Sequence, residues 1–352
     1  MESQPNALVS IIIPCHNTKK TLLSDCLYSL HEQSYGNLEI IVVDDGSDAE
    51  YAAMYDKLIS RMDDNDMIWK CCHNVHGGVS AARNKGMDLS CGAYLCFLDS
   101  DDYLNIDFIR ILLEMILKTG VPVAHCEMVN TYKTEADWTC GIDGMPEYKV
   151  FQGLDVFKNC NGYVTPKMYS RKLIEQEQIR FQEGRRIGED LLFVANVCER
   201  VLVSAGTKAQ LYYYRLNPWS TTNKMSAKDY DQQTEAFQYL LTIPCIAEDA
   251  QWFSKEIKIQ SYCKLKRMTA AIREKEHDWR QKYKNYRREY LENTAGHIVI
   301  ADGMYKWLAT KSLQLGAGWG IVFLMSYESL KNLYMALRNW IRKLRYEMEK
   351  RI

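Results

Sequence analysis

The chain has 352 residues, of which 47% are apolar and 25% charged, and its net charge is −1. This length allows one large domain and a smaller one, and the apolar share is sufficient for a core. The near-zero charge produces no overall field that attracts nucleic acid, so we expect no nucleic-acid partner. Twelve cysteines at irregular spacing favour free thiols in a reducing compartment over a disulfide framework.

Two further features bear on location. The first ten residues contain neither a basic segment nor a long apolar segment, so we expect no signal peptide. Residues 313–325 form the longest weakly polar stretch, which is too short and too rich in glycine for a membrane span. The sequence therefore indicates a cytosolic protein.

The N-terminal part alternates between apolar runs and helical spacing. The pattern predicts buried strands at residues 9–13 and 38–43, and helices at 22–30 and 54–62. Pro14 is expected to leave the sheet, because proline disrupts a central strand. A glycine turn at 77–78 is expected to open a third helix, with Ser80 as its N-cap.

The central stretch is residues 94–103, YLCFLDSDDY, a short apolar strand that ends in Asp99, Asp101 and Asp102. In open α/β sheets, ligands bind at the carboxyl ends of the strands. Clustered carboxylates repel one another unless a cation lies among them, which favours a hard divalent ion. Asp99-Ser100-Asp101 is then a DXD motif, in which one acid faces a ribose hydroxyl and the other holds a metal bound to a diphosphate. The alternative is a solvated acidic turn.

Later elements continue the same alternation. The pattern predicts a helix at residues 107–118 and a strand at 121–128. It also predicts a helix that begins at the acidic pair 189–190, and an aromatic strand at 211–215. Beyond about residue 225 the strand signals end and helical, charge-rich segments follow. Strands and helices in this order, with acids at the strand ends, predict an α/β fold with a doubly wound parallel sheet.

Six motifs occur together in a fixed order: VSIIIPCHN (9–17), VVDDGS (42–47), GGVSAARNKGM (77–87), FLDSDD (97–102), GED (188–190) and YYYR (212–215). The set resembles the inverting glycosyltransferases of family 2, over residues 8–222. Residues 165–174 and 179–184 resemble the bacterial branch that builds surface polysaccharides. The resemblance implies a GT-A nucleotide-diphospho-sugar transferase fold, with a mostly parallel central sheet flanked by helices. We expect this catalytic domain at 1–225 and a helical domain at 226–352.

The resemblance also implies a nucleotide-sugar donor, UDP-linked, and a set of donor-binding residues. Pro14 and His16 match positions that lie against the base, and Asp45 matches the acid that accepts from the uracil N3–H. Arg215 and Ser220 match positions that contact the diphosphate. The remaining donor-site positions are Asn17, Arg83, Asn84, Asp99 and Ser100, of which Arg83 and Asn84 are expected near the ribose and phosphate.

The same resemblance implies the metal and the catalytic base. Asp101 and Asp99 are the expected ligands of Mn²⁺ or Mg²⁺, and Asp102 either caps the following helix or adds to the metal shell. An inverting displacement needs a carboxylate that takes the proton of the acceptor hydroxyl. Asp190 matches that base and Glu189 is the second choice. The implied reaction is hexosyl or N-acetylhexosaminyl transfer to a growing surface glycan or a lipid-linked acceptor.

Several other interpretations fit less well. Phosphatases of the haloacid dehalogenase type have Thr or Val where this chain has Tyr103, and a dinucleotide site needs a GxGxxG motif after the first strand, which is absent. Cys71-Cys72-His73 with His76 does not have a usual zinc spacing. A non-catalytic relative, acting as a binding or assembly subunit, would have no need to keep both the DXD and the ED acids.

The C-terminal segment 329–352 has an apolar stripe at helical spacing, with seven basic and two acidic residues and therefore a local charge of +5. One interpretation is an interfacial helix on the inner face of the cell membrane, beside a lipid-linked acceptor. The other is a helix that packs on its own domain or on another subunit. The resemblance favours the membrane, and the sequence leaves the oligomeric state open.

Overall fold

The structure is a computed structural model. It describes residues 6–62, 67–131, 139–160, 162–201, 203–216 and 225–249, with single residues between 267 and 288. The chain divides into two compact units, residues 1–216 and 217–352. Ser220 and the segment 329–352, both singled out by the sequence, lie outside the described residues.

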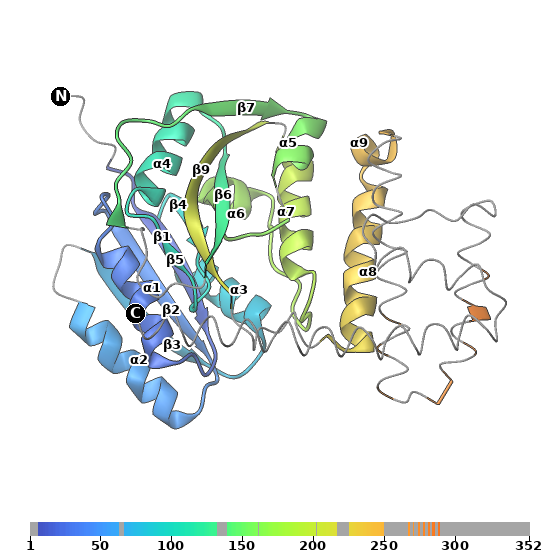
Figure 1. The fold of residues 1–352 in the computed structure, drawn as a ribbon, viewed down its shortest axis with the longest axis horizontal. Coiled ribbons are helices and arrows are strands. Elements are labelled where there is room, and N and C mark those ends of the chain that lie inside the picture. Colours follow the sequence, from blue (N-terminus) through green and yellow to red (C-terminus); the bar gives the residue numbers. More distant parts are fainter. Residues whose placement is uncertain are drawn as a thin grey trace. The chain divides into compact units, whose positions relative to one another are not determined.

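The first unit contains nine strands and seven helices among its described residues (Figure 1). The strands are β1 (Val9–Cys15), β2 (Leu38–Asp45), β3 (Ile68–Asn74), β4 (Tyr94–Phe97), β5 (Tyr103–Leu104), β6 (Val123–Thr131), β7 (Tyr148–Gln152), β8 (Lys167–Ser170) and β9 (Val203–Arg215). The helices are α1 (Lys20–His31), α2 (Ala49–Met62), α3 (Val79–Leu89), α4 (Phe108–Thr119), α5 (Leu154–Asn159), α6 (Arg171–Gln176) and α7 (Glu189–Arg200).

All nine strands form one sheet, in the order β3-β2-β1-β4-β8-β6-β9-β5, with β7 also paired to β9. Strands β1 to β4 are parallel to one another, and β6 is parallel to β9. Among the described strands, β8, β5 and β7 run antiparallel to their neighbours. The carboxyl ends of β1, β2 and β4 therefore meet at one edge of the sheet, and the amino end of β8 lies at the same edge.

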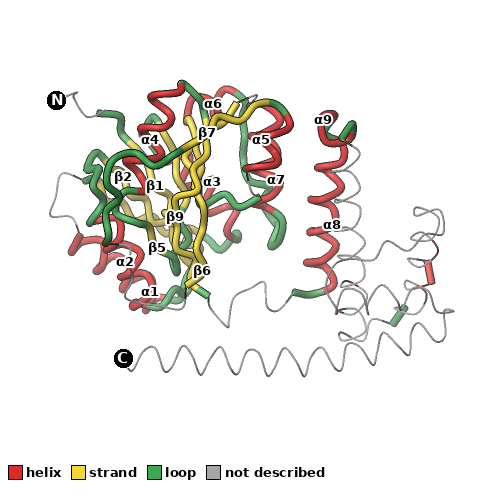
Figure 2. Tube along the Cα trace, turned by 45° about the horizontal axis from the view of Figure 1, so that its top comes forward, coloured by secondary structure: helices red, strands yellow, loops and turns green. Residues whose placement is uncertain are grey.

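Helices cover both faces of the sheet (Figure 2). Along β1, Ile11 and Ile13 pack in a buried cluster with residues of α1, α2 and α4. Ile12 points to the opposite face and packs with residues of α3, α5, α6 and α7. This alternation follows from the two-residue period of a strand. Because both faces are covered, the strands read as continuous apolar runs, which made β1 and β2 recognisable from the sequence.

Pro14 corrects one expectation, because it lies inside β1 and pairs with Val43 of β2. The carbonyl of Ile12 points toward β4, where it accepts from the Leu98 N–H. Peptide groups two residues apart in a strand point to the same side, so the Pro14 nitrogen faces the β4 side. The pairing of β1 with β4 ends at Ile12. The missing N–H therefore costs no ladder hydrogen bond.

Other local differences are instructive. Ser80 is not the N-cap of α3. The cap is Gly78, and the buried Ser80 hydroxyl has no hydrogen-bond partner among the described residues. The aromatic strand expected at 211–215 is the end of the longer β9. Six elements of the first unit, β3, β5, β7, β8, α5 and α6, were not expected.

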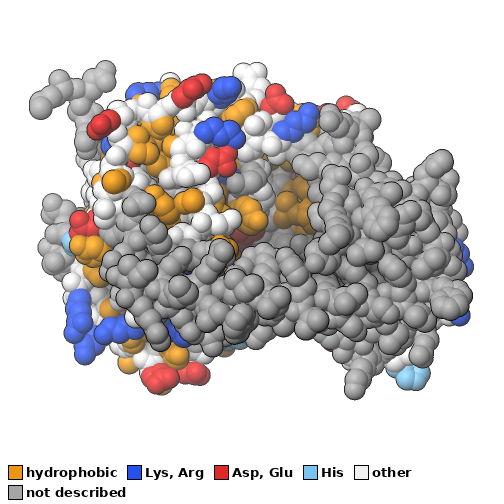
Figure 3. Space-filling model, in the orientation of Figure 1, with side chains coloured by type: hydrophobic (Ala, Val, Ile, Leu, Met, Phe, Trp, Pro, Cys, Tyr) orange, Lys and Arg blue, Asp and Glu red, His pale blue; other side chains and the backbone are white. Residues whose placement is uncertain are grey.

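The second unit contains α8 (Ala227–Thr242) and α9 (Pro244–Ala247) among its described residues. Ser226 and Asp229 form a capping box at the start of α8. Pro244 opens α9, where its missing N–H is not needed. None of the described helices has the length and apolar composition that a bilayer crossing requires. Basic and acidic side chains are interspersed among the described residues on the face drawn in Figure 3.

Candidate active site

The edge of the sheet where β1, β2 and β4 end carries most of the predicted site residues. His16 follows β1, Asp45 ends β2, and Asp99 follows β4. The register of the three parallel strands sets these ends side by side. Helix α7 begins at Glu189, so its acidic first turn brings a second pair of carboxylates.

Asp45 holds the glycine turn that opens α3. Its Oδ1 accepts from the Gly77 N–H at 2.8 Å and its Oδ2 from the Gly78 N–H at 2.9 Å. Gly46 has a φ of +69°, and a Cβ added there would lie 2.6 Å from the His76 backbone nitrogen. Only glycine fits this close approach. Oδ1 accepts one hydrogen bond in this arrangement, and a carboxylate oxygen can accept two.

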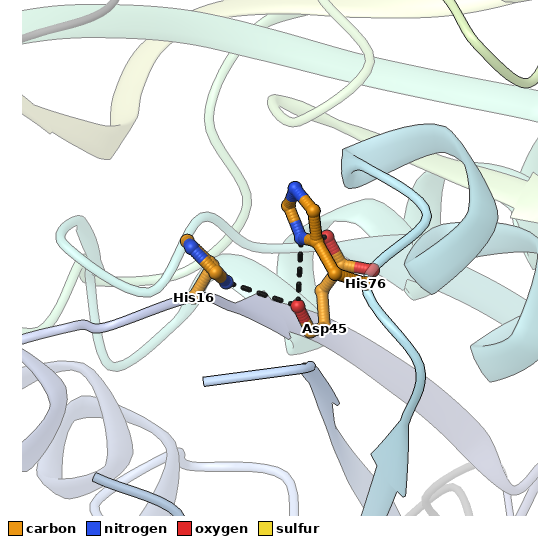
Figure 4. Close-up of side chains that lie close together, drawn as sticks. All are labelled: His16, Asp45 and His76. Atoms are coloured by element: carbon orange, nitrogen blue, oxygen red, sulfur yellow. Dashed lines mark hydrogen bonds and ion pairs between the residues drawn. The ribbon is translucent and has the colours of Figure 1, made fainter. Parts of the chain in front are cut away.

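His16 and His76 lie on either side of the Asp45 backbone carbonyl (Figure 4). The Nδ1 atoms of both rings are 2.9 Å from that carbonyl oxygen. Because a carbonyl only accepts, both Nδ1 atoms carry a proton. The ring centroids are 4.5 Å apart, with a tilt of 34°, and both side chains are exposed. The sequence pointed to His16 but not to His76, since a lone histidine before a glycine turn carries no pattern.

The DXD turn is fixed at its middle residue and carries its acids at the surface. The Ser100 hydroxyl is buried and lies 2.7 Å from the Thr18 hydroxyl, which joins the turn to the loop after β1. Asp99 and Asp101 are partly exposed. Their carboxylate oxygens are the hard donors that Mg²⁺ or Mn²⁺ prefers. The residues present at the DXD turn therefore fit a hard divalent cation.

Asp102 corrects part of another expectation, because the cap of the following helix α4 is Asp107, and the other alternative, a place in the metal shell, stays a prediction. Its side chain is only 1% exposed. Its carboxylate accepts from the Tyr212 hydroxyl at 2.7 Å and from the Arg215 N–H at 2.8 Å. Burial first, and then the charges of Asp101 and Asp99, raise the pKa of Asp102 well above its usual value. Asp102 thus ties the end of β9 to the DXD turn.

That tie places Arg215 beside the DXD turn. The Arg215 guanidinium is 2% exposed, lies 5.2 Å from the centroid of the Tyr103 ring, and donates from Nη1 to Asp25 at 3.0 Å. Its buried Nε and Nη2 have no hydrogen-bond partner among the described residues. A buried donor left unpaired costs roughly 1–3 kcal/mol. Two such donors on one cation point to an anionic ligand.

Arg83 occupies the centre of the candidate site, and its side chain is 3% exposed. Nη1 is 2.5 Å from Asp190 Oδ1, and Nη2 is 2.8 Å from Asp99 Oδ1. Glu189 Oε1 lies 3.8 Å from Nη1. The expected position of Arg83 near the ribose and phosphate stays a prediction, and among the described residues its guanidinium pairs with three carboxylates. Although burial alone lowers the pKa of Arg83, these carboxylates raise it above its usual value.

Glu189 and Asp190 differ in what holds them. Asp190 is fixed by Arg83 and by the Val164 N–H, which donates to Oδ2 at 3.2 Å. Burial raises the pKa of Asp190, and the Arg83 charge opposes that shift. Burial and the charge of Asp190 raise the pKa of Glu189 to about 7. The pair therefore contains one acid firmly bound to a cation and one that titrates near neutrality.

Two expected donor-site residues have other contacts in the structure. The Asn84 side chain makes two hydrogen bonds to the backbone of Phe181. Its Oδ1 accepts from the Phe181 N–H at 2.9 Å, and its Nδ2 donates to the Phe181 carbonyl at 3.0 Å. Asn17 has a φ of 49°, and its amide donates to the Asp48 carboxylate and accepts from the Asp48 backbone N–H. Both amides position loops at the edge of the sheet, and their contact with a donor stays a prediction. Ser220 is outside the described residues.

Residues 10–177, which include β2 to β8 and all of β1 except Val9, match the family model described as glycosyl transferase family 2. This segment belongs to glycosyl transferase family 2. The match covers the DDGS, glycine-turn and DXD segments, and it ends before the acidic pair at 189–190 and before Arg215.

The curated relatives include bacterial glycosyltransferases. Glycosyltransferase GlyA of Streptococcus pneumoniae is 29% identical over 67% of this chain and 34% of that protein. The uncharacterized glycosyltransferase EpsJ of Bacillus subtilis is 30% identical over 61% of this chain and 63% of that protein. The chain thus spans from about a third to less than two thirds of these relatives.

Solved structures confirm the predicted fold of this chain. Staphylococcus aureus TarS, residues 1–349 in complex with UDP-GlcNAc, superposes with a TM-score of 0.59 at 16% identity, over 92% of this chain and 91% of that one. Mannosyltransferase PcManGT from Pyrobaculum calidifontis, in complex with GDP-Man and Mn²⁺, superposes with a TM-score of 0.53 at 14% identity, over 93% of this chain and 87% of that one. An α/β GT-A fold with a central sheet between helices was expected and is found.

Proposed function

We propose that this chain is an inverting glycosyltransferase that moves a sugar from a UDP-linked donor to a hydroxyl of a surface glycan or a lipid-linked acceptor. One observation carries the proposal. The candidate base Asp190 and the DXD residue Asp99 bind the same buried Arg83. Residues 91 positions apart in the sequence, from different elements, therefore lie within one charged cluster at the ligand-binding edge.

The proposed diphosphate site combines Arg215 with the DXD turn. Nε and Nη2 of Arg215, which have no partner in the part of the chain that the structure describes, would supply charge-assisted donors. Asp101 and Asp99 would hold Mn²⁺ or Mg²⁺, which when bound neutralises the leaving diphosphate as a Lewis acid. PcManGT was solved with Mn²⁺. Because Asp102 accepts from the Arg215 N–H, the end of β9 is tied to the turn that carries the proposed metal ligands.

The proposed base site for uracil consists of Asp45, His16 and the ring of His76. Asp45 Oδ1 would accept from N3–H, and the two exposed imidazole rings provide a surface for stacking. TarS was solved with UDP-GlcNAc, whereas PcManGT was solved with GDP-Man. Uridine is thus the proposal for this chain, and a panel of UDP, GDP and other nucleotide sugars tests it.

An inverting displacement in the proposed site needs a carboxylate on the side of the sugar opposite the leaving group. Asp190 is the proposed base, because Arg83 and the Val164 N–H fix its two oxygens in a defined orientation. Arg83 would keep Asp190 ionised. As the acceptor hydroxyl attacks the anomeric carbon, Asp190 would take its proton, and the bond to the diphosphate would break with inversion.

Replacing Asp101 with Asn tests the donor site. The change removes the main anionic ligand of the proposed ion, so UDP binding should lose most of its Mn²⁺ dependence. Calorimetric titration of UDP, with and without Mn²⁺, measures this. Asp143→Asn, at an exposed position before β7, is the matched control and should titrate as wild type. Unchanged Mn²⁺ dependence in Asp101→Asn would exclude Asp101 as the ligand.

We also propose that the C-terminal segment 329–352 attaches the enzyme to the inner face of the membrane. Its net charge of +5 favours an anionic surface by roughly 1 kcal/mol for each basic residue near it, and salt screens this attraction. The full chain should co-sediment with anionic vesicles at low salt and less at high salt. Deletion of residues 329–352 should abolish vesicle binding but leave hydrolysis of the donor unchanged. Equal vesicle binding by the shortened chain would contradict the proposal.

A further inference from the structure

A second cluster of ligand-type side chains lies on the edge strand of the sheet. Cys71 and His73 are two residues apart on β3, so they share one face of the strand. Asp56 of α2 lies opposite, with Oδ1 3.0 Å from His73 Nε2. One potential ligand atom from each of the three residues lies within 4.8 Å of the others. These residues have no part in the proposed transfer reaction.

The orientation of His73 is fixed from the other side of its ring. Nδ1 is 2.8 Å from Oδ2 of Asp44, a buried carboxylate whose Oδ1 accepts from the Ser47 N–H at 2.9 Å. A carboxylate that holds one imidazole nitrogen while the other binds a metal is the usual outer arrangement of zinc histidines. The ring therefore directs Nε2 toward Asp56 and Cys71.

We infer that Asp56, Cys71 and His73 form a site for one Zn²⁺-type ion, separate from the DXD turn. Sulfur, imidazole nitrogen and carboxylate oxygen are a common zinc donor set, and water would complete a tetrahedral shell. The side chains of His73 and Asp56 are 43% and 58% exposed, so an ion can enter from solvent. On binding, the Cys71 thiol and the His73 Nε2–H, which faces Asp56 when no metal is bound, both give their protons to solvent, and His73 then coordinates through Nε2. Nothing is oxidised or reduced.

The two metal sites would select different ions. Asp99 and Asp101 offer oxygen atoms only, which suit Mg²⁺ or Mn²⁺, whereas a thiolate and an imidazole favour Zn²⁺. The inferred site would join α2 to the edge strand β3. Through Asp44 it would also stabilise the turn at residues 44–47. Zinc would thus stabilise a turn beside the proposed base site for uracil without being part of that site.

The test uses the full chain, freed of metal by a chelator and kept reduced. One sample is titrated with Zn²⁺ and a second with Co²⁺. Both contain excess Mg²⁺, which occupies sites whose ligands are all oxygen atoms. We expect one equivalent of Zn²⁺ to bind and the Co²⁺ form to show the charge-transfer absorption of a cysteine thiolate. Cys71→Ser should lose that absorption. Asp56→Asn, on the exposed side of the site, should weaken binding even if Cys71→Ser folds poorly.

Graded and control variants sharpen the result. Asp44→Asn should weaken Zn²⁺ binding by about 10- to 100-fold, as expected for a residue that orients a ligand. Cys72→Ser is the matched control, because its side chain alternates to the other face of β3. Asp101→Asn should also bind as wild type. Binding that survives in both Cys71→Ser and Asp56→Asn, or that is lost in His76→Gln instead, would overturn the inference, as would no binding at all.

Discussion

Asp190→Asn is expected to leave UDP binding nearly intact and to lower turnover by about 100- to 10,000-fold, the usual effect of a lost general base. The amide keeps the shape of the side chain and its contact with the Val164 N–H, but it does not take a proton. Calorimetry with UDP measures the first effect. The rate of transfer, or of slow hydrolysis of the UDP-sugar selected by the donor panel, measures the second.

Glu189→Gln is the matched control for this prediction, and it should be much the milder change. The pKa of Glu189 is raised to about 7, so the residue is protonated below that pH and ionised above it. Its ionisation adds negative charge beside Asp190 and strengthens it as a base. Wild-type turnover should therefore rise as pH passes about 7, and this rise should vanish in Glu189→Gln. If Glu189→Gln proves more damaging than Asp190→Asn, the two roles must be exchanged.

Arg83→Met should destabilise the fold by about 3–5 kcal/mol, the range for removing one partner of a buried ion pair. Methionine fills part of the space but leaves Asp99, Glu189 and Asp190 without their shared cation. Turnover should fall as well, since Asp190 loses the group that orients it. Urea unfolding, followed by circular dichroism, measures the stability change.

Two variants make the Arg83 result specific. Arg83→Lys keeps the charge but cannot form two parallel contacts, so its stability should lie between wild type and Arg83→Met. Arg61→Met, at an exposed position in the last turn of α2, should change stability by less than about 0.5 kcal/mol. Ionising Glu189 costs stability as pH rises through its raised pKa, so low pH should relieve the Arg83→Met deficit. A wild-type unfolding midpoint in Arg83→Met would show that the carboxylates do not need this cation.

The fold was predictable where local pattern and final environment agree. β1 and β2 are buried on both faces, so their apolar runs are continuous. β3 was missed because it is an edge strand of mixed exposure, and its sequence IWKCCHN shows neither a continuous apolar run nor clear alternation. β9 was predicted only at its aromatic end, because its middle contains polar, partly exposed residues and its pairing with β6 shifts register.

The candidate site was predictable at the strand ends, where acids follow apolar runs in the sequence. The contacts between those ends were not. Arg83 and Asp190 are separated by 107 positions, and their ion pair depends on how α3 and α7 meet the same edge of the sheet. Asp102 and Arg215 are 113 positions apart and meet because β5 pairs with β9. Distances of this kind arise from topology, and no local pattern encodes them.

The reversed direction of β8 has a consequence for how sequences of this kind can change over time. Because β8 runs against β4, the segment before it, residues 162–166, reaches the edge of the sheet where the other strands end. The segment holds Asp190 through a main-chain group, the Val164 N–H. Any residue other than proline supplies that group. The exposed Tyr163 side chain can therefore change, and new acceptor preferences can arise there, while the buried Val164 and Thr165 hold the N–H on the carboxylate of the proposed base.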